Sequence, residues 1–278
     1  MKIEQPKYFP TVIEAAHLVI LYLFIQALID FPLALWDYYH GTDYLSHPVK
    51  RNIVNVGSVV FILLFAWRKS HAKLPELFPV KRFNLLIIIP MTAFLMAAHV
   101  FLVEVNTIVD KLIPAPPWFL ELLNRLFENK FGIYGTAIKV ALIAPIVEEL
   151  IFRGIIMHGF MRNYHSVTAI LVSALFFALF HLNPWQFPTT FLLGLLLGWI
   201  MVITRNIIVC IIGHSINNLL VLLIIEFHEP LSETAFFLME KSKQLTISYI
   251  VAGLCVMLIA LIALFKKKKN KIFRTLNS

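Results

Sequence analysis

The chain has 278 residues, of which 59% are hydrophobic and only 14% are charged, and its formal net charge at pH 7 is +8. So much apolar content with so few charges excludes an ordinary soluble globular chain and is typical of a membrane protein. The positive charge does not indicate nucleic-acid binding, because Lys and Arg gather in short connectors and at the C-terminus and form no basic face interleaved with aromatic residues. We therefore expect an integral membrane protein without a nucleic-acid partner.

The N-terminal stretch MKIEQPKYFP leads into an apolar run that has no small-residue cleavage pattern. We therefore expect a retained first membrane helix and no removed signal peptide. The two cysteines, Cys210 and Cys255, lie inside apolar runs and show no CxxC or Cys/His metal spacing. They are interpreted as small apolar side chains in helices, without a disulfide framework or a structural zinc site.

A helix that crosses the hydrocarbon core of a bilayer needs about 20 mostly apolar residues. The predicted fold class is all-α: a polytopic membrane bundle of about eight transmembrane helices with a polar intramembrane site. Residues 1–278 are expected to form a single integral membrane domain, with N-terminal helices over about 12–105. The eight candidate spans are 12–34, 53–67, 83–105, 133–152, 167–182, 188–204, 207–225 and 246–265. The fourth is expected to continue as a helix to about residue 160.

Basic residues dominate several connectors. The segment 68–82 has five Lys or Arg against one Glu, Arg205 follows the sixth span, and the tail KKKKNKIFR is wholly basic. With eight spans, these segments fall on the same side as both termini. Because Lys and Arg accumulate on the cytoplasmic side, both termini are predicted to be cytoplasmic, and the compact chain suggests a bacterial cell membrane. Residues 114–132 are predicted to form an amphipathic helix on the outer interface, with an ordinary surface loop as the alternative.

Ionisable residues at membrane depth are rare and usually face a cavity or a partner. Glu149 and Arg153, in the stretch APIVEELIFRG, stand four positions apart and can form an ion pair on one helix face. Glu148 is rotated from its neighbour by about 100° and cannot use the same arginine equally well. It is therefore the carboxylate left for proton transfer. The alternative is that all three charges serve only packing.

The same four-residue spacing occurs twice more, in Phe177 with His181 and in His214 with Asn218. A carboxylate, two histidines and an amide from three helices could line one polar pocket. Such a set could deprotonate a water molecule and offer hydrogen-bond donors to an oxyanion. The remaining ionisable residues in the spans are interpreted as caps, interface-reaching groups or interhelical partners: Glu14, His17, Asp30, His99 and Lys139. Gly194 and Gly198 form a GxxxG spacing that predicts close helix packing.

Three blocks, EELIFR (148–153), FALFH (177–181) and HSINN (214–218), follow one another on successive late spans. Their patterns EExxxR, FxxxH and HxxxN resemble the CPBP family, which comprises type II CaaX prenyl proteases and their bacterial relatives, the Abi proteins. The motifs cover about residues 130–220, within a protease-like core over about 130–225. The resemblance implies an intramembrane endopeptidase of the glutamate type that acts on membrane-associated peptides or proteins.

The resemblance implies that Glu148 and His181 activate the attacking water. It likewise implies that His214 and Asn218 stabilise the oxyanion. Glu149, Arg153 and Phe177 take supporting roles. Family members have been described as metalloproteases, and Glu148, His181 and His214 could supply the three protein ligands that catalytic zinc requires. Because the chain has no HExxH and Asn218 is a poor zinc ligand, we favour a mechanism without a metal or other cofactor, with zinc as the alternative.

Two other classes of function remain open. One is a non-catalytic membrane scaffold or bacteriocin-immunity protein of the same fold. The other is a small-solute transporter, which the absence of a second, symmetry-related half in the sequence disfavours.

Overall fold

A computed structural model of the protein describes residues 8–42, 44, 48–119, 121 and 132–227. Every regular element in these residues is helical, which confirms the all-α prediction for this part of the chain. The seven predicted spans that fall within it are all helices. The eighth, 246–265, and most of the predicted interfacial helix lie outside the described residues.

The chain divides into two compact units. One comprises Met1–Lys81 and Ala115–Ile211, and the other Arg82–Pro114 and Ile212–Ser278. The boundary between them falls inside the helix α11, Ile207–Glu226. Apart from that helix, the second unit contains a short 3₁₀ turn, η1 at Leu85–Ile87, and the helix α4 at Ile88–Leu112.

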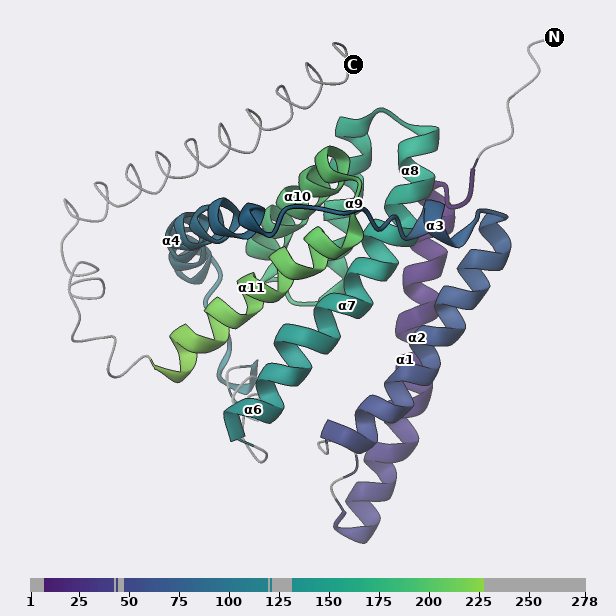
Figure 1. Ribbon diagram of the computed structural model, residues 1–278. Coiled ribbons are helices and arrows are strands. Elements are labelled where there is room, and N and C mark those ends of the chain that lie inside the picture. Colours follow the sequence, from purple (N-terminus) through teal and green to yellow (C-terminus); the bar gives the residue numbers. More distant parts are fainter. Residues whose placement is uncertain (1–7, 43, 45–47, 120, 122–131, 228–278) are drawn as a thin grey trace, which may run out of the picture. The chain divides into compact units, whose positions relative to one another are not determined.

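The first unit begins with two long helices, α1 at Val12–His40 and α2 at Pro48–Ser70, which pack side by side (Figure 1). Thr11 and Glu14 form a capping box at the start of α1, so Glu14 has one of the two roles expected for it, a cap or an interface-reaching group. A short helix, α3 at Leu74–Leu77, follows.

A nearly continuous helix carries the EExxxR motif. Its segments are α6 at Gly132–Ala137, η2 at Ile138–Ile143, α7 at Ala144–Glu149, η3 at Leu150–Ile156 and α8 at Met157–Asn163. It reaches three residues beyond the end expected from the sequence. Two further helices complete the unit: α9 at Ser166–Phe180 and α10 at Phe187–Thr204, which pack closely along one another.

Among the residues that the structure describes, three helical segments are long and apolar enough to cross a membrane: Val12–His40, Phe187–Thr204 and Ile207–Ile224. Leu85–His99 and Ser166–Phe180 are apolar but shorter. The core of the first unit gathers where η3 contacts α2 and α9, and every residue from Ile151 to Ile156 is buried there. Glu149, Arg153 and Phe177 of the first two motif blocks are therefore held in the buried core of this unit.

Candidate active site

The EExxxR motif lies at a junction between α-helical and π-helical backbone. Segments η2 and η3 are π-helical, and the two glutamates end the α-helical segment α7 between them. Pro145 explains the first of these irregularities, because it has no N–H to donate to the preceding turn and its ring crowds the carbonyl there. Single π turns inside α-helices are frequent at functional sites, because they re-aim the side chains that follow.

Glu149 and Arg153 form the ion pair that their spacing predicts. Arg153 Nη1 donates to Glu149 Oε1 at 3.0 Å, and the two residues are only 1% and 0% exposed. The other terminal nitrogen, Nη2, donates to the backbone oxygen of Gly194 at 3.2 Å. Two buried charges therefore neutralise one another, and a carbonyl of α10 fixes the direction of the guanidinium.

Phe177 connects this ion pair to the second motif. The guanidinium of Arg153 lies 4.6 Å from the centre of the Phe177 ring, which is a cation–π contact. The same ring meets Phe152 edge to face at 5.2 Å and lies 5.0 Å from the ring of His181. The predicted supporting residue thus packs between the buried arginine and the motif histidine.

His181 is the C-cap residue of α9, and its ring is held in one orientation. Its Nδ1 lies 2.9 Å from the backbone oxygen of Phe177. Because a carbonyl oxygen can only accept a hydrogen bond, Nδ1 carries the proton, and the lone pair of the neutral ring is on Nε2. That tautomer can accept a proton or orient a water molecule through Nε2.

Glu148 directly precedes the buried Glu149 but has different surroundings. Its side chain is half-buried, whereas that of Glu149 is fully buried, and its Oε2 atom is shielded from solvent. The two adjacent carboxylates therefore have distinct surroundings: Glu149 is held in the predicted ion pair with Arg153, and Glu148 is partly accessible.

The third motif lies in the second unit, on α11. His214 is 2% exposed, and Asn217 Nδ2 donates to Asn218 Oδ1 at 3.2 Å. This bond orients the Asn218 amide so that its NH₂ group lies at the opposite edge. The juxtaposition of His214 and Asn218 with Glu148 and His181 remains a prediction from the sequence.

The motifs do not predict the contact of the ion pair with the carbonyl of Gly194. A Cβ built on Gly194 would lie 2.9 Å from Ala174 Cα and 3.0 Å from Ala174 Cβ. Glycine is therefore required for α10 to approach α9 this closely, which confirms the predicted packing role of the GxxxG spacing. The same spacing was the only sequence signal for the carbonyl that Arg153 uses.

Within the part of the chain that the structure describes, no group of three or more His, Cys, Asp or Glu residues is arranged to hold a metal ion. Cys210 is a buried free thiol on α11, as expected for a small apolar side chain, and Cys255 lies outside the described residues.

Residues 130–220 match the family described as type II CAAX prenyl endopeptidase, Rce1-like. The family predicted from the three motifs is thereby confirmed over the segment that contains them. No match to the chain is found among curated proteins or among solved structures. The match, together with the apolar helices, indicates an integral membrane protein with a segment similar to membrane endopeptidases.

Proposed function

We propose that this protein is an intramembrane endopeptidase of the glutamate type, which hydrolyses peptide bonds of membrane-associated peptides or proteins. The observation that carries the proposal is the difference between two neighbouring carboxylates. Arg153 and the Gly194 carbonyl hold Glu149 in a buried ion pair, while Glu148 beside it is partly accessible. Placing a second charge, that of Glu148, in an apolar site costs free energy, so a functional reason for its presence is expected. Peptide hydrolysis, the activity named for the matched family, provides one.

In the proposed reaction, Glu148 accepts a proton from a water molecule that Nε2 of His181 helps to orient. The water oxygen then bonds to the scissile carbonyl carbon, and the carbonyl oxygen becomes an oxyanion. His214 and Asn218 donate hydrogen bonds to that oxygen. The C–N bond breaks as Glu148 returns its proton to the leaving amine, which leaves a carboxylic acid and an amine.

The proposal includes the finer features expected from the sequence. These are about eight membrane spans in one domain over residues 1–278, cytoplasmic termini in a bacterial cell membrane, and no metal or other cofactor. The zinc-dependent alternative would use Glu148, His181 and His214 as ligands, with a bound water as the nucleophile. The bacteriocin-immunity or scaffold alternative would use the same fold without hydrolysis.

The decisive experiment compares cells that express the wild-type chain with cells that express Glu148→Gln, by mass spectrometry of newly formed peptide termini. We expect the wild type to generate termini that the variant lacks. Peptides spanning those sites are then given to the purified full chain, and kcat/KM is expected to fall about 10²- to 10⁴-fold in the variant. The matched control is Glu76→Gln, which removes an exposed carboxylate of α3 and should cleave like the wild type.

Equal cleavage by Glu148→Gln and the wild type would overturn the glutamate mechanism. A wild-type chain that generates no termini, while its variant keeps the full cellular phenotype, would establish the scaffold alternative. Exhaustive chelation separates the two protease mechanisms. We expect activity to persist, whereas lasting loss that zinc restores would require the metal-dependent one.

A further inference from the structure

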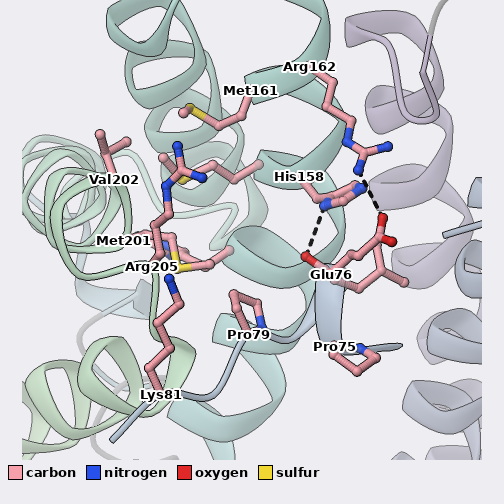
Figure 2. A pocket seen from close by; sticks show the side chains of 13 residues that line it. Pro75, Glu76, Pro79, Lys81, His158, Met161, Arg162, Met201, Val202 and Arg205 are labelled. Atoms are coloured by element: carbon pink, nitrogen blue, oxygen red, sulfur yellow. Dashed lines mark hydrogen bonds and ion pairs between the residues drawn. The ribbon is translucent and has the colours of Figure 1, made fainter. Parts of the chain in front are cut away.

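A second polar region of the first unit lies at one end of its helices, and the proposed hydrolysis does not use it. A pocket of about 380 Å³ opens between α3, the following connector, α8 and the end of α10 (Figure 2). Its apolar lining is rich in methionine and consists of Pro75, Leu77, Pro79, Met157, Met161, Met201 and Val202. A flexible methionine wall suits an irregular apolar ligand.

The charged lining of the pocket is unbalanced. Glu76 is engaged from two sides: Arg162 Nη2 donates to its carboxylate at 2.9 Å, and His158 Nδ1 donates to its backbone oxygen at 3.1 Å. Lys81 and Arg205 extend into the same part of the pocket, away from Glu76 (Figure 2). Among the residues that the structure describes, neither of these cations has an acidic partner.

Two direct hydrogen bonds hold the backbone at Lys81 and Pro79 in place. Asn206 is only 1% exposed, and its Nδ2 donates to the backbone oxygen of Lys81 at 2.6 Å. The next backbone N–H, that of Ile207, donates to the oxygen of Pro79 at 2.9 Å. These two bonds join residues 79–81 to residues 206–207, next to the positions of Lys81 and Arg205.

The backbone of Arg205 is also held in a fixed conformation. Arg205 caps α10 in the left-handed region, at φ 47° and ψ 47°, with its N–H bonded to the oxygen of Met201. Residues with a Cβ rarely adopt this conformation. Here it ends the helix and places Arg205 in the lining of the same pocket as Lys81. The two cations are thus fixed by the fold at their backbones, unlike cations on an open surface.

The position of the pocket along the helix suggests its ligand. Arg205 directly follows Phe187–Thr204, a candidate membrane-spanning helix, so the pocket lies where that span ends. Basic pockets between helices at this level bind the headgroups of anionic lipids. The planar guanidinium offers paired donors to phosphate oxygens, and the lysine adds a point charge.

We propose that this pocket binds an anionic phospholipid. Lys81 and Arg205 contact the phosphate of the headgroup, and the methionine residues pack against the apolar part of the lipid. The pocket does not include Glu148. Arg153 of the buried ion pair also contributes to its lining, but binding of a lipid there does not depend on the proposed hydrolysis. A soluble phosphate ester shares the headgroup chemistry but lacks acyl chains, and it therefore distinguishes a lipid site from a simple anion site.

The test uses the full chain in a non-ionic detergent with equimolar dioleoyl phosphatidylglycerol and dioleoyl phosphatidylcholine. Bound lipid is counted by native mass spectrometry. We expect the wild type to prefer phosphatidylglycerol, and excess glycerol 3-phosphate to displace it poorly. In Lys81→Gln/Arg205→Gln the preference should fall about 25-fold, since each cation near the membrane surface contributes about fivefold.

A matched control removes the same charge elsewhere. Arg68→Gln/Lys73→Gln alters two exposed cations that do not line the pocket and should bind like the wild type. Asn206→Ala keeps both pocket cations but breaks the bond to Lys81, and we expect it to bind phosphatidylglycerol several-fold more weakly. Thermal unfolding of each variant checks that it is folded.

Two results would overturn the proposal. One is an unchanged preference in Lys81→Gln/Arg205→Gln. The other is an equal loss in both double variants, which would show that net charge alone attracts the lipid. Complete displacement by glycerol 3-phosphate would replace the lipid site with a site for soluble phosphate esters. The two double variants decide the question even where Asn206→Ala fails to fold.

Discussion

The Glu149–Arg153 pair and the basic pocket are two charged regions of the same unit, and their charges have opposite arrangements. In the pair, a cation and an anion are buried together and neutralise each other, and Arg153 also donates to the Gly194 carbonyl. In the pocket, neither Lys81 nor Arg205 has an acidic partner among the described residues, although buried Asn206 holds the backbone of Lys81. Charge that is neutralised within the fold supports the structure, whereas charge that is held but left uncompensated is available to a ligand.

The largest effect on stability is expected where that neutralisation is removed. Arg153→Met leaves Glu149 buried at 0% exposure without its cation. Removing one partner of a buried pair costs about 3–5 kcal/mol in the free energy of unfolding, because the remaining charge is uncompensated. Thermal or chemical unfolding of the purified chain in detergent measures the loss.

A second variant tests the reason for that loss. Adding Glu149→Gln to Arg153→Met removes the stranded charge, so most of the stability is expected to return. If the double variant were as unstable as the single one, then the packing of the arginine against Phe177, and not charge compensation, would be what the fold requires.

A smaller effect is expected at the glycine whose carbonyl completes the pair. In Gly194→Ala, the new methyl group would meet the Ala174 backbone at 2.9 Å, so α9 and α10 must separate. Overpacking of this kind costs about 1–3 kcal/mol in the free energy of unfolding. Separation would also draw the Gly194 carbonyl away from the guanidinium of Arg153.

The control for that substitution is the other glycine of the same spacing. A methyl group in Gly198→Ala meets Ile170 Cγ2 at 3.3 Å, a side-chain atom that can move by a few tenths of an ångström. Its loss of stability should be the smaller of the two. Equal losses for the two variants would mean that Gly194 has no special part in supporting Arg153.

The helices of the first unit could be predicted from the sequence because each apolar run is bounded by polar or helix-breaking residues. The predicted run 188–204 differs from α10 by one residue, since Pro188 and Arg205 mark its ends. The prediction for α1 stopped at residue 34, but the helix continues through Pro32 to His40. A single internal proline and a more polar last turn did not end it, because neighbouring backbone bonds maintain the helix.

Some contacts of the active site and the pocket could also be predicted from the sequence, and others could not. The bond between Glu149 and Arg153 follows from helical spacing, and so does the contact of Phe177 with His181. The bonds to the Gly194 carbonyl and from Asn206 to the Lys81 carbonyl could not be predicted, because they join backbone atoms of distant segments. The spacing of residues in the sequence predicts which side chains share a helix face. It does not predict which backbone carbonyl of a neighbouring helix they will contact.

The smallest effect on stability is expected at Arg162 and Glu76, the exposed ion pair of the pocket. These two charges are paired, like Glu149 and Arg153, but they are exposed to solvent, like Lys81 and Arg205. Arg162 and Glu76 bond at 2.9 Å but are both about 40% exposed, so Arg162→Gln should change the free energy of unfolding by less than about 1 kcal/mol. Burial lowers the pKa of His158, and the nearby charge of Arg162 lowers it further. Removing that charge should therefore raise the pKa of His158 toward its ordinary value, which NMR titration of the imidazole detects. A large loss of stability with an unmoved pKa would show that Arg162 belongs with the neutralised pair and has no part in the electrostatics of the pocket.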